Sequence, residues 1–314
     1  MAEIKKILIA NRGEIVQRAI RTIKEMGKKS VAVYSAGDKN ASYLKHADEA
    51  VCIGGAKSSE SYLNIPALIT AAEMTGCDAI FPGYGFLSEN QDFVEICKLH
   101  NIKFIGPSSE VMEKMADKSK AKEEMVRAGV PVVPGSKGAV RTLDEGKKIA
   151  REIGYPIMAK ASAGGGGRGM RLIKEEKDFD SQYLAASSEA LAAFGDGTMY
   201  LERFINNPRH IEVQVIGDSH GNAIHIGERD CSLQRRHQKV IEESPAILLN
   251  DETRAKLHEV AVKATKYLKY EGAGTFEFLA DDKQNIYFME MNTRLQVEHP
   301  VSEMVSGLDI IEWM

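Results

Sequence analysis

The stretch Lys160-Ala-Ser-Ala-Gly-Gly-Gly-Gly-Arg-Gly169 decides the fold, because it places a run of glycines between two apolar segments of strand length. Four consecutive glycines add nothing to a core and cost backbone entropy on folding. They do allow backbone N–H groups to approach an anion closely, as in phosphate-binding loops. Lys160, at the end of the first strand, is suited to binding a phosphate as a point charge. We interpret the segment as a strand–loop–strand cover over a nucleotide; a flexible surface loop is the alternative.

The loop matches neither of the commoner nucleotide-binding patterns. No Gly-Lys-Ser or Gly-Lys-Thr follows it, as a Walker motif requires, and it does not join a strand to a helix, as in a dinucleotide-binding turn. Residues 157 to about 204 have the pattern strand, loop, strand, helix, strand, with a further helix expected at 143–153. The proline-rich stretch 130–135 precedes them as a linker. This pattern predicts a small separate lobe.

Upstream of the linker, short apolar strands alternate with amphipathic helices. This alternation predicts a parallel sheet with helices on both faces. Ligands of such sheets bind at the carboxyl ends of the strands, where residues 11–14 and 82–86 fall. The expected strands are 7–10, 30–34, 50–53, 79–81 and 103–105, and the expected helices are 14–26, 65–75 and 92–99.

Downstream of the lobe, apolar and polar residues alternate. The runs are 210–216, 223–227, 275–279 and 286–290, and a long helix is expected at 251–270. Strict alternation is typical of an antiparallel sheet with one face on a core. We therefore expect the other face to carry a site, with the helix lying against the sheet.

The most informative polar residues lie at 290–299, Glu-Met-Asn-Thr-Arg-Leu-Gln-Val-Glu-His. In an extended chain, every second side chain points to the same face. One face would then carry the polar residues, and the other would suit a core. The polar face comprises Glu290, Asn292, Arg294, Gln296 and Glu298, and the other comprises Met291, Thr293, Leu295 and Val297.

A carboxylate on the preceding strand suggests a metal site. Glu277 stands between two phenylalanines, and a hairpin loop at 282–285 would place it directly opposite Glu290. Like charges in that position destabilise a strand pair, so a cation between them is expected. Magnesium suits one or two carboxylates completed by water and phosphate oxygens. A solvated sheet face of alternating charge is the alternative.

A third cluster, residues 228–239, is rich in basic side chains. An exposed basic turn is the simplest interpretation. Because 45 acidic residues outnumber 41 basic ones, for a net charge of -4, we expect no general affinity for nucleic acid or an anionic membrane. A small anion such as a terminal phosphate or bicarbonate fits the cluster better.

Composition points to a soluble globular protein. The 314 residues are 43% hydrophobic and 27% charged, and apolar runs such as 7–10 are too short for a membrane span or a signal-peptide core. We therefore expect a cytoplasmic protein. Its four cysteines stand singly, which predicts buried small hydrophobes and no zinc site: Cys52, Cys77, Cys97 and Cys231.

Together these motifs resemble biotin carboxylase, of the ATP-grasp superfamily, over essentially the whole chain. The motifs are Ala-Asn11-Arg-Gly-Glu-Ile, Gly83-Tyr-Gly-Phe-Leu-Ser-Glu-Asn90, Lys160 with its glycine-rich loop, Glu228-Arg-Asp-Cys-Ser232, Arg235-Arg-His-Gln-Lys239 and Glu290-Met-Asn-Thr-Arg-Leu-Gln-Val-Glu-His-Pro300. The resemblance implies an α/β protein whose doubly wound parallel-sheet domain, 1–115, precedes an ATP-grasp domain, 116–314. The latter divides into a lid lobe, about 131–204, and an antiparallel-sheet lobe, 205–314.

The resemblance also implies roles for matching residues. Glu298 would be the general base, acting with Lys239 and Arg294. Magnesium, or manganese, would be bound by Glu277, Glu290 and Asn292, and bicarbonate by Lys239, Arg294, Gln296 and the Val297 backbone. ATP would be bound by Lys118, Lys160, Gly166, Gly167, the hinge Glu202, Arg203, Phe204 and Ile205, His210, His237, Glu277 and Glu290. Arg203-Phe204 stands where the family often has Lys-Tyr, a change that a backbone contact to adenine would tolerate.

The implied activity is the ATP- and bicarbonate-dependent carboxylation of biotin, through carboxyphosphate. The biotin is a substrate attached to a biotin carboxyl carrier protein, and carboxyltransferase subunits are the other expected partners. Acetyl-CoA carboxylase is the expected assembly, with a two-subunit pyruvate carboxylase as the alternative. Two further alternatives are another ATP-grasp ligase that makes an acyl or carbamoyl phosphate, and a nucleotide-binding chain without activity.

The C-terminus departs from the family pattern. Biotin carboxylases normally continue well beyond the position of Met314, and this chain stops in an apparent helix without a Gly or polar stop signal. The resemblance therefore implies an incomplete C-terminal lobe, without a further arginine and without surface that forms the family's homodimer. We expect magnesium–ATP binding with feeble or absent biotin carboxylation, and an altered or lost dimer interface.

Overall fold

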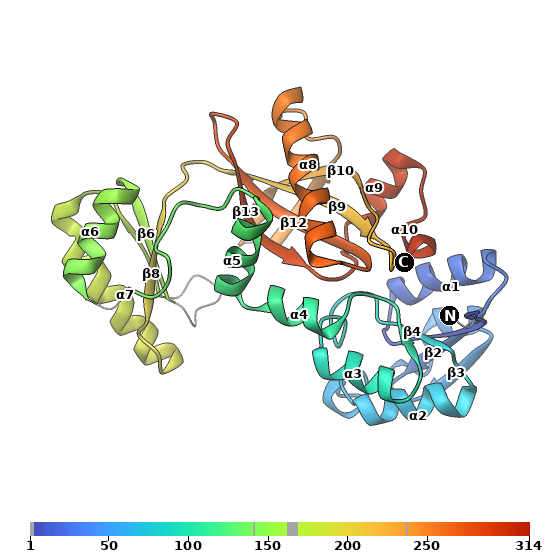
Figure 1. The fold of residues 1–314 in the computed structure, drawn as a ribbon. Coiled ribbons are helices and arrows are strands. Elements are labelled where there is room, and N and C mark those ends of the chain that lie inside the picture. Colours follow the sequence, from blue (N-terminus) through green and yellow to red (C-terminus); the bar gives the residue numbers. More distant parts are fainter. Residues whose placement is uncertain (1–2, 141, 162–168, 237) are drawn as a thin grey trace. The chain divides into compact units, whose positions relative to one another are not determined.

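The computed structural model describes residues 3–140, 142–161, 169–236 and 238–314 (Figure 1). The chain forms two compact units. The first unit comprises Met1–Val130, Arg209–Leu279 and Met289–Met314, and the second comprises Pro131–Pro208 and Ala280–Phe288. A domain division at residues 115 and 116 stays a prediction. Among the described residues, no helix is both long and apolar enough to cross a bilayer.

The first unit begins with a five-stranded sheet of order β3-β2-β1-β4-β5. All four strand pairs are parallel, as the sequence predicts; Ile7, for example, pairs with Ser30 on one side and Ala79 on the other. The strands are β1 (Lys6–Ile9), β2 (Lys29–Tyr34), β3 (Glu49–Cys52), β4 (Ala79–Phe81) and β5 (Lys103–Phe104). Short 3-10 helices lie at Ala36–Asp38, Ser42–His46 and Ser58–Glu60.

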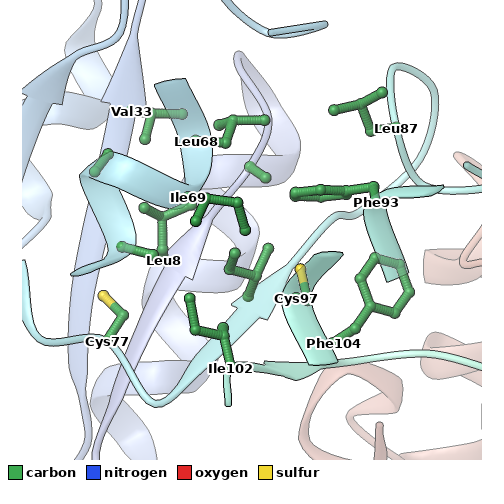
Figure 2. Packing of buried hydrophobic residues seen from close by; sticks show 14 of the residues in the cluster. Leu8, Val33, Leu68, Ile69, Cys77, Leu87, Phe93, Cys97, Ile102 and Phe104 are labelled. Carbon is green, nitrogen blue, oxygen red and sulfur yellow. The ribbon is translucent and has the colours of Figure 1, made fainter. Parts of the chain in front are cut away.

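Helices cover both faces of this sheet, and side chains of β1 alternate between them. Leu8 packs with residues of α2 (Ile65–Thr75) and α3 (Gln91–Leu99), including Leu68 and Phe93 (Figure 2). Ile7 and Ile9 pack on the opposite face with α1 (Glu14–Glu25). Three of the four cysteines are buried, as expected, but the expectation is wrong for Cys52, which is exposed on the edge strand β3.

Local signals fix the helix ends. The Asn64 side chain accepts a hydrogen bond from the Ala67 N–H at the start of α2, and Gly76 ends the helix at φ 64°. Asn90 caps α3 in the same way. The helices α4 (Ser109–Ala116) and α5 (Lys118–Ala128), which the sequence analysis does not predict, connect this part of the chain to the linker.

The second sheet of the first unit has the order β11-β10-β9-β12-β13. β10 pairs antiparallel with β9 and β11, and α8 (Asp251–Leu268) packs against β9 and β10 as expected. The strands are β9 (Arg209–Gly217), β10 (Ala223–Arg235), β11 (Gln238–Glu243), β12 (Gly272–Ala280) and β13 (Ile286–Asn292). The chain ends with α9 (His299–Ser306) and α10 (Ile310–Trp313).

The second unit has the two strands that the sequence predicts on either side of the glycine-rich residues. Its antiparallel sheet has the order β7-β6-β8, with Lys160 opposite Met170 across β6 and β7. The glycine-rich residues between these strands, 162–168, lie outside the described residues. The strands are β6 (Ile157–Ala161), β7 (Met170–Ile173) and β8 (Met199–Arg203), and the helices are α6 (Leu143–Ile153), η4 (Glu176–Asp178) and α7 (Phe179–Phe194).

Glu228 on β10 holds α8 to the second sheet. Its buried carboxylate contacts Arg254 Nε at 2.9 Å and His258 Nε2 at 2.6 Å, and accepts the Ala246 N–H at 3.1 Å. Burial alone would raise the pKa of Glu228, but the His258 and Arg254 contacts outweigh it and lower the pKa to about 2. A lowered pKa in the folded state stabilises the fold at pH values above the ordinary pKa of 4.5. This stabilisation is lost as the pH falls toward 2.

Glutamine at Glu228 should remove this pH-dependent stabilisation. At neutral pH, the shift corresponds to about 3 kcal/mol of folding free energy. The wild-type advantage over Glu228→Gln should be constant above pH 5 and smaller by about 1 kcal/mol at pH 4. Urea unfolding of both proteins across this range measures it. An advantage that grows as the pH falls would contradict the assignment.

Candidate active site

Lys239 is the centre of a charged cluster on the second sheet of the first unit. From β11, its Nζ lies 2.7 Å from Glu298 Oε1 and 2.9 Å from Glu277 Oε1, and it also contacts Glu212. Burial alone would lower the pKa of Lys239, but the charges of Glu212 and Glu277 outweigh it and raise the pKa above its ordinary value. The ammonium group therefore stays charged between three carboxylates.

Glu277, on β12, is buried and accepts contacts at both carboxylate oxygens. Asn292 Nδ2 donates to its Oε1 at 2.9 Å and Gln296 Nε2 at 3.0 Å, and His210 Nε2 lies 3.1 Å from its Oε2. Burial would raise the pKa of Glu277, but the His210 contact and the Lys239 charge lower it to about 2. Glu277 is therefore ionised at neutral pH, as a metal ligand must be.

Glu298, immediately before α9, faces the same ammonium group. Its side chain is 9% exposed. Burial would raise its pKa, but the hydrogen bond and charge of Lys239 outweigh this effect and hold the pKa below the ordinary value. The carboxylate can accept a proton at neutral pH, and loss of the Lys239 contact would make it a stronger base.

Arg229 lies behind this cluster and is fully buried. Its Nε contacts Glu212 Oε1 at 2.5 Å, and its terminal nitrogens donate to Gln214 Oε1 at 2.9 Å, Ser302 Oγ at 2.7 Å and Gln296 Oε1 at 2.8 Å. Gln296 therefore connects Arg229 to Glu277. A buried arginine with its acceptors satisfied holds these side chains in one arrangement.

The polar segment 290–298 is less extended than the simple alternation requires. β13 ends at Asn292, and residues 297 and 298 form a turn before α9. Asn292, Gln296 and Glu298 still reach the cluster of Lys239 and Glu277. The expectation that Val297 suits a core is wrong: its side chain lies in this turn and is 61% exposed.

Arg294 points its guanidinium along the same segment. Its terminal nitrogens donate to Asn292 Oδ1 at 2.9 Å and to the Leu295 carbonyl at 3.1 Å, and its Nε donates to Glu89 Oε2 at 2.9 Å. The structure thus brings Arg294 next to Asn292, which itself contacts Glu277. An ammonium, a guanidinium and a carboxylate are available here for a small oxyanion and its proton.

Comparisons with known proteins identify the family of this chain. The family "Biotin carboxylase, N-terminal domain" matches residues 3–112, and "Carbamoyl-phosphate synthase L chain, ATP binding domain" matches residues 117–314. The chain is 57% identical to the biotin carboxylase of Nostoc sp. over 98% of its own length and 68% of that protein. The chain belongs to the biotin carboxylase family.

Solved structures of biotin carboxylases share the fold. A Campylobacter jejuni biotin carboxylase, crystallised as a β-γ-ATP complex, is 71% identical with a TM-score of 0.89, over 99% of this chain and 70% of that one. The biotin carboxylase subunit of a pyruvate carboxylase is 53% identical with a TM-score of 0.85, over 99% and 69%. The mixed α/β fold with ATP-grasp architecture, expected from the sequence, is confirmed. The chain spans about two thirds of each of these proteins.

For a biotin carboxylase, the residues present fit a magnesium ion. Glu277 and Glu290 lie on the neighbouring strands β12 and β13, and Glu290 Oε2 lies 3.3 Å from Lys118 Nζ. Three carboxylates of the cluster, those of Glu212, Glu277 and Glu298, share Lys239 and Arg229, which leaves a negative charge in excess. Donor atoms of His210, Glu212 and Glu277 lie within 4.8 Å of one another. Carboxylate oxygens in such a setting suit a hard divalent cation.

The remaining residues that the resemblance implies in ATP binding belong to the second unit or lie outside the described residues. Lys160 Nζ lies 2.5 Å from the buried Glu202 Oε2. The Arg203 N–H donates to the Pro134 carbonyl at 2.8 Å, the Phe204 N–H donates to the Pro156 carbonyl at 3.0 Å, and Ile205 follows β8. Gly166, Gly167 and His237 lie outside the described residues. Their nucleotide contacts stay a prediction.

Sequence analysis missed three charged residues of this site: Glu212, Arg229 and Glu89. Glu212 and Arg229 are fully buried and satisfy each other from neighbouring strands. One signal was available, because Glu212 is two residues after His210 on an alternating strand and so shares its face. The partner on β10 could not be found from spacing alone.

Proposed function

We propose that the chain carboxylates biotin with ATP and bicarbonate, through carboxyphosphate, as the first half-reaction of acetyl-CoA carboxylase. The observation that carries the proposal is the contact of Lys239 with Glu298 and Glu277. A cation that bridges the expected base and an expected metal ligand would, in this proposal, hold bicarbonate beside the γ-phosphate of ATP. Membership of the biotin carboxylase family supports the same conclusion.

Bicarbonate is a poor electrophile because hydroxide is a poor leaving group. In the proposed first step, Lys239 and Arg294 hold bicarbonate by charge, with Gln296 and the Val297 backbone as further contacts. Bicarbonate takes the place of Glu298 beside Lys239, and Glu298 accepts its proton. A bicarbonate oxygen then attacks the γ-phosphorus, the bond to ADP breaks, and carboxyphosphate forms. Positioning and charge compensation account for most of the catalysis in such a transfer.

Carboxyphosphate then breaks at its carbon–oxygen bond to give carbon dioxide and phosphate. The phosphate accepts the proton of the ureido nitrogen of biotin, and the resulting enolate attacks carbon dioxide. Exclusion of water protects the mixed anhydride from hydrolysis during this sequence. The substrate would be biotin attached to a carrier protein, and carboxyltransferase subunits would use the product.

Glu277, Glu290 and Asn292 would hold the magnesium ion that accompanies ATP. When bound, the ion offsets charge on the phosphate oxygens. The two carboxylates provide the negative charge that this role needs, and the lowered pKa of Glu277 keeps it ionised. Lys118 and His210, which contact Glu290 and Glu277, would bind phosphate oxygens.

The test of this function is bicarbonate-dependent ATP hydrolysis. Free biotin should stimulate the bicarbonate-dependent rate, and ammonia should not. Stimulation by ammonia instead would favour a ligase that forms carbamoyl phosphate. We consider this alternative because the family matched at residues 117–314 is described as a carbamoyl-phosphate synthase ATP-binding domain. Tight magnesium–ATP binding without turnover would indicate a nucleotide-binding chain that is not an enzyme.

The acceptor of the carboxyl group is the finer part of the proposal. Acetyl-CoA carboxylase is our choice because it is the assembly that the sequence resemblance to biotin carboxylase favours. The similarity to a biotin carboxylase subunit of pyruvate carboxylase keeps pyruvate as the alternative. Isolation of the complex from its native source, followed by identification of the biotinylated protein and its carboxyltransferase, separates the two.

A further inference from the structure

One motif of the sequence, residues 83–90, has no role in the reaction described above. Its backbone is held by Asn11, two residues after β1: Asn11 Nδ2 donates to the carbonyls of Pro82 and Tyr84, both at 2.8 Å. Gly83 adopts φ 65°, and an added side chain there would meet Asn11 at 3.1 Å. The segment ends at Asn90, which caps α3. The loop is therefore fixed at both ends.

The loop presents Glu89 to the segment that follows β13. Oε1 of Glu89 accepts the Thr293 N–H at 3.0 Å and the Thr293 hydroxyl at 3.1 Å. Oε2 accepts Arg294 Nε–H at 2.9 Å. Both oxygens of a single carboxylate thus fix two successive residues, where the chain leaves the strand and turns toward Glu298.

These contacts determine which edge of Arg294 is available. Arginine carries five N–H groups in a rigid fork. Each of the three nitrogens donates one N–H: Nε to Glu89, one terminal nitrogen to Asn292 and the other to the Leu295 carbonyl. The described part of the chain shows no further hydrogen bond of Arg294. One N–H then remains on each terminal nitrogen. A carboxylate-like anion with two oxygens can accept from both of these N–H groups.

We propose that Glu89 is the positioning residue that orients Arg294 for bicarbonate, so that the parallel-sheet domain helps to build the bicarbonate site. This inference rests on the proposed function. Glu89 touches neither ATP nor the reacting atoms in that mechanism and acts through Arg294. Its loss should therefore weaken bicarbonate binding selectively, and the affinity for magnesium–ATP should not change.

Glu89→Gln tests the inference, because the amide retains the shape but loses the charge that holds Nε. We expect the KM for bicarbonate to rise about tenfold, the usual scale of a hydrogen bond to a charged group. The Kd for magnesium–ATP, measured by calorimetry, and the melting temperature should match those of the wild type. The matched control is Glu73→Gln, which removes a similarly exposed carboxylate that contacts His100 at 2.7 Å, away from the site.

A double-mutant cycle separates positioning from a general effect. Arg294→Lys retains the charge but lacks the Nε–H that Glu89 accepts. In that background, Glu89→Gln should raise the KM for bicarbonate less than it does in the wild type. An additive effect, an unchanged KM for bicarbonate, or an equal loss of ATP and bicarbonate affinity would overturn the inference and leave the proposed function standing. A wild-type protein without bicarbonate-dependent turnover would overturn both.

Discussion

Glutamine in place of Glu290 is expected to abolish magnesium-dependent ATP hydrolysis and to leave the fold intact. Glu290 is a partly exposed carboxylate on β13, so an amide of the same shape should fit without repacking. The substitution removes one of the two charges proposed to hold magnesium and leaves Lys118 without its anionic partner at 3.3 Å. Charge stabilisation by a metal is worth several kcal/mol, which corresponds to a loss of roughly 10³-fold or more in turnover.

The measurement is the steady-state rate over a magnesium titration, with circular dichroism as the check on folding. Glu271→Gln is the matched control, since Glu271 is also a carboxylate paired with a lysine, Lys103, at similar exposure. It lies just before β12 and outside the cluster, so its turnover should equal that of the wild type. Normal turnover of Glu290→Gln at saturating magnesium would refute the metal assignment.

The second large effect is expected from Glu298→Gln. Loss of a general base typically costs roughly 10²-fold or more, and bicarbonate-dependent turnover should fall by that factor. Affinity for magnesium–ATP should change little. Glu298 contacts Lys239, and any effect of Glu298 on the proposed phosphate ligands would pass through Lys239. Single-turnover hydrolysis and calorimetric ATP binding measure the two quantities separately.

Glu303→Gln provides a control on the neighbouring helix. Glu303 is 12% exposed and contacts Arg18 at 2.7 Å, close to the 9% exposure and 2.7 Å contact of Glu298 with Lys239. Because it faces α1 rather than the cluster, it should retain turnover if the protein stays folded. A large loss of ATP affinity in Glu298→Gln with normal turnover would show that Glu298 is structural.

Local sequence signals were sufficient for most of the fold. The helix at 65–75 was predicted at its observed bounds, because Asn64 and Gly76 determine its two ends through side-chain and backbone geometry. β10 was predicted to end at 227 but continues to Arg235. Its polar second half gives no apolar alternation, and its partner β11 supplies the hydrogen bonds that hold it in the sheet.

Only those residues of the site that lie close together in the sequence could be predicted from it. Alternation along 290–298 predicts one polar face. Of its residues, Asn292 and Gln296 contact Glu277 and Glu298 contacts Lys239, although the strand ends at Asn292. Glu89 could not be placed, because its partners Thr293 and Arg294 are about 200 positions away in the chain and no periodic pattern relates them. Long-range pairs of charged side chains require the folded topology.

The fate of bicarbonate oxygen tests the central claim, the attack of bicarbonate on ATP, most directly. The protein would hydrolyse magnesium–ATP in unlabelled water with bicarbonate that carries heavy oxygen. The reaction would be sampled before the bicarbonate exchanges its label with water. Because the attacking oxygen stays on phosphorus when carboxyphosphate breaks at its carbon–oxygen bond, the released phosphate should carry a labelled oxygen from bicarbonate. Mass spectrometry of the phosphate gives the answer. Phosphate that takes up heavy oxygen only from labelled water would show that water attacks ATP, and would contradict the account.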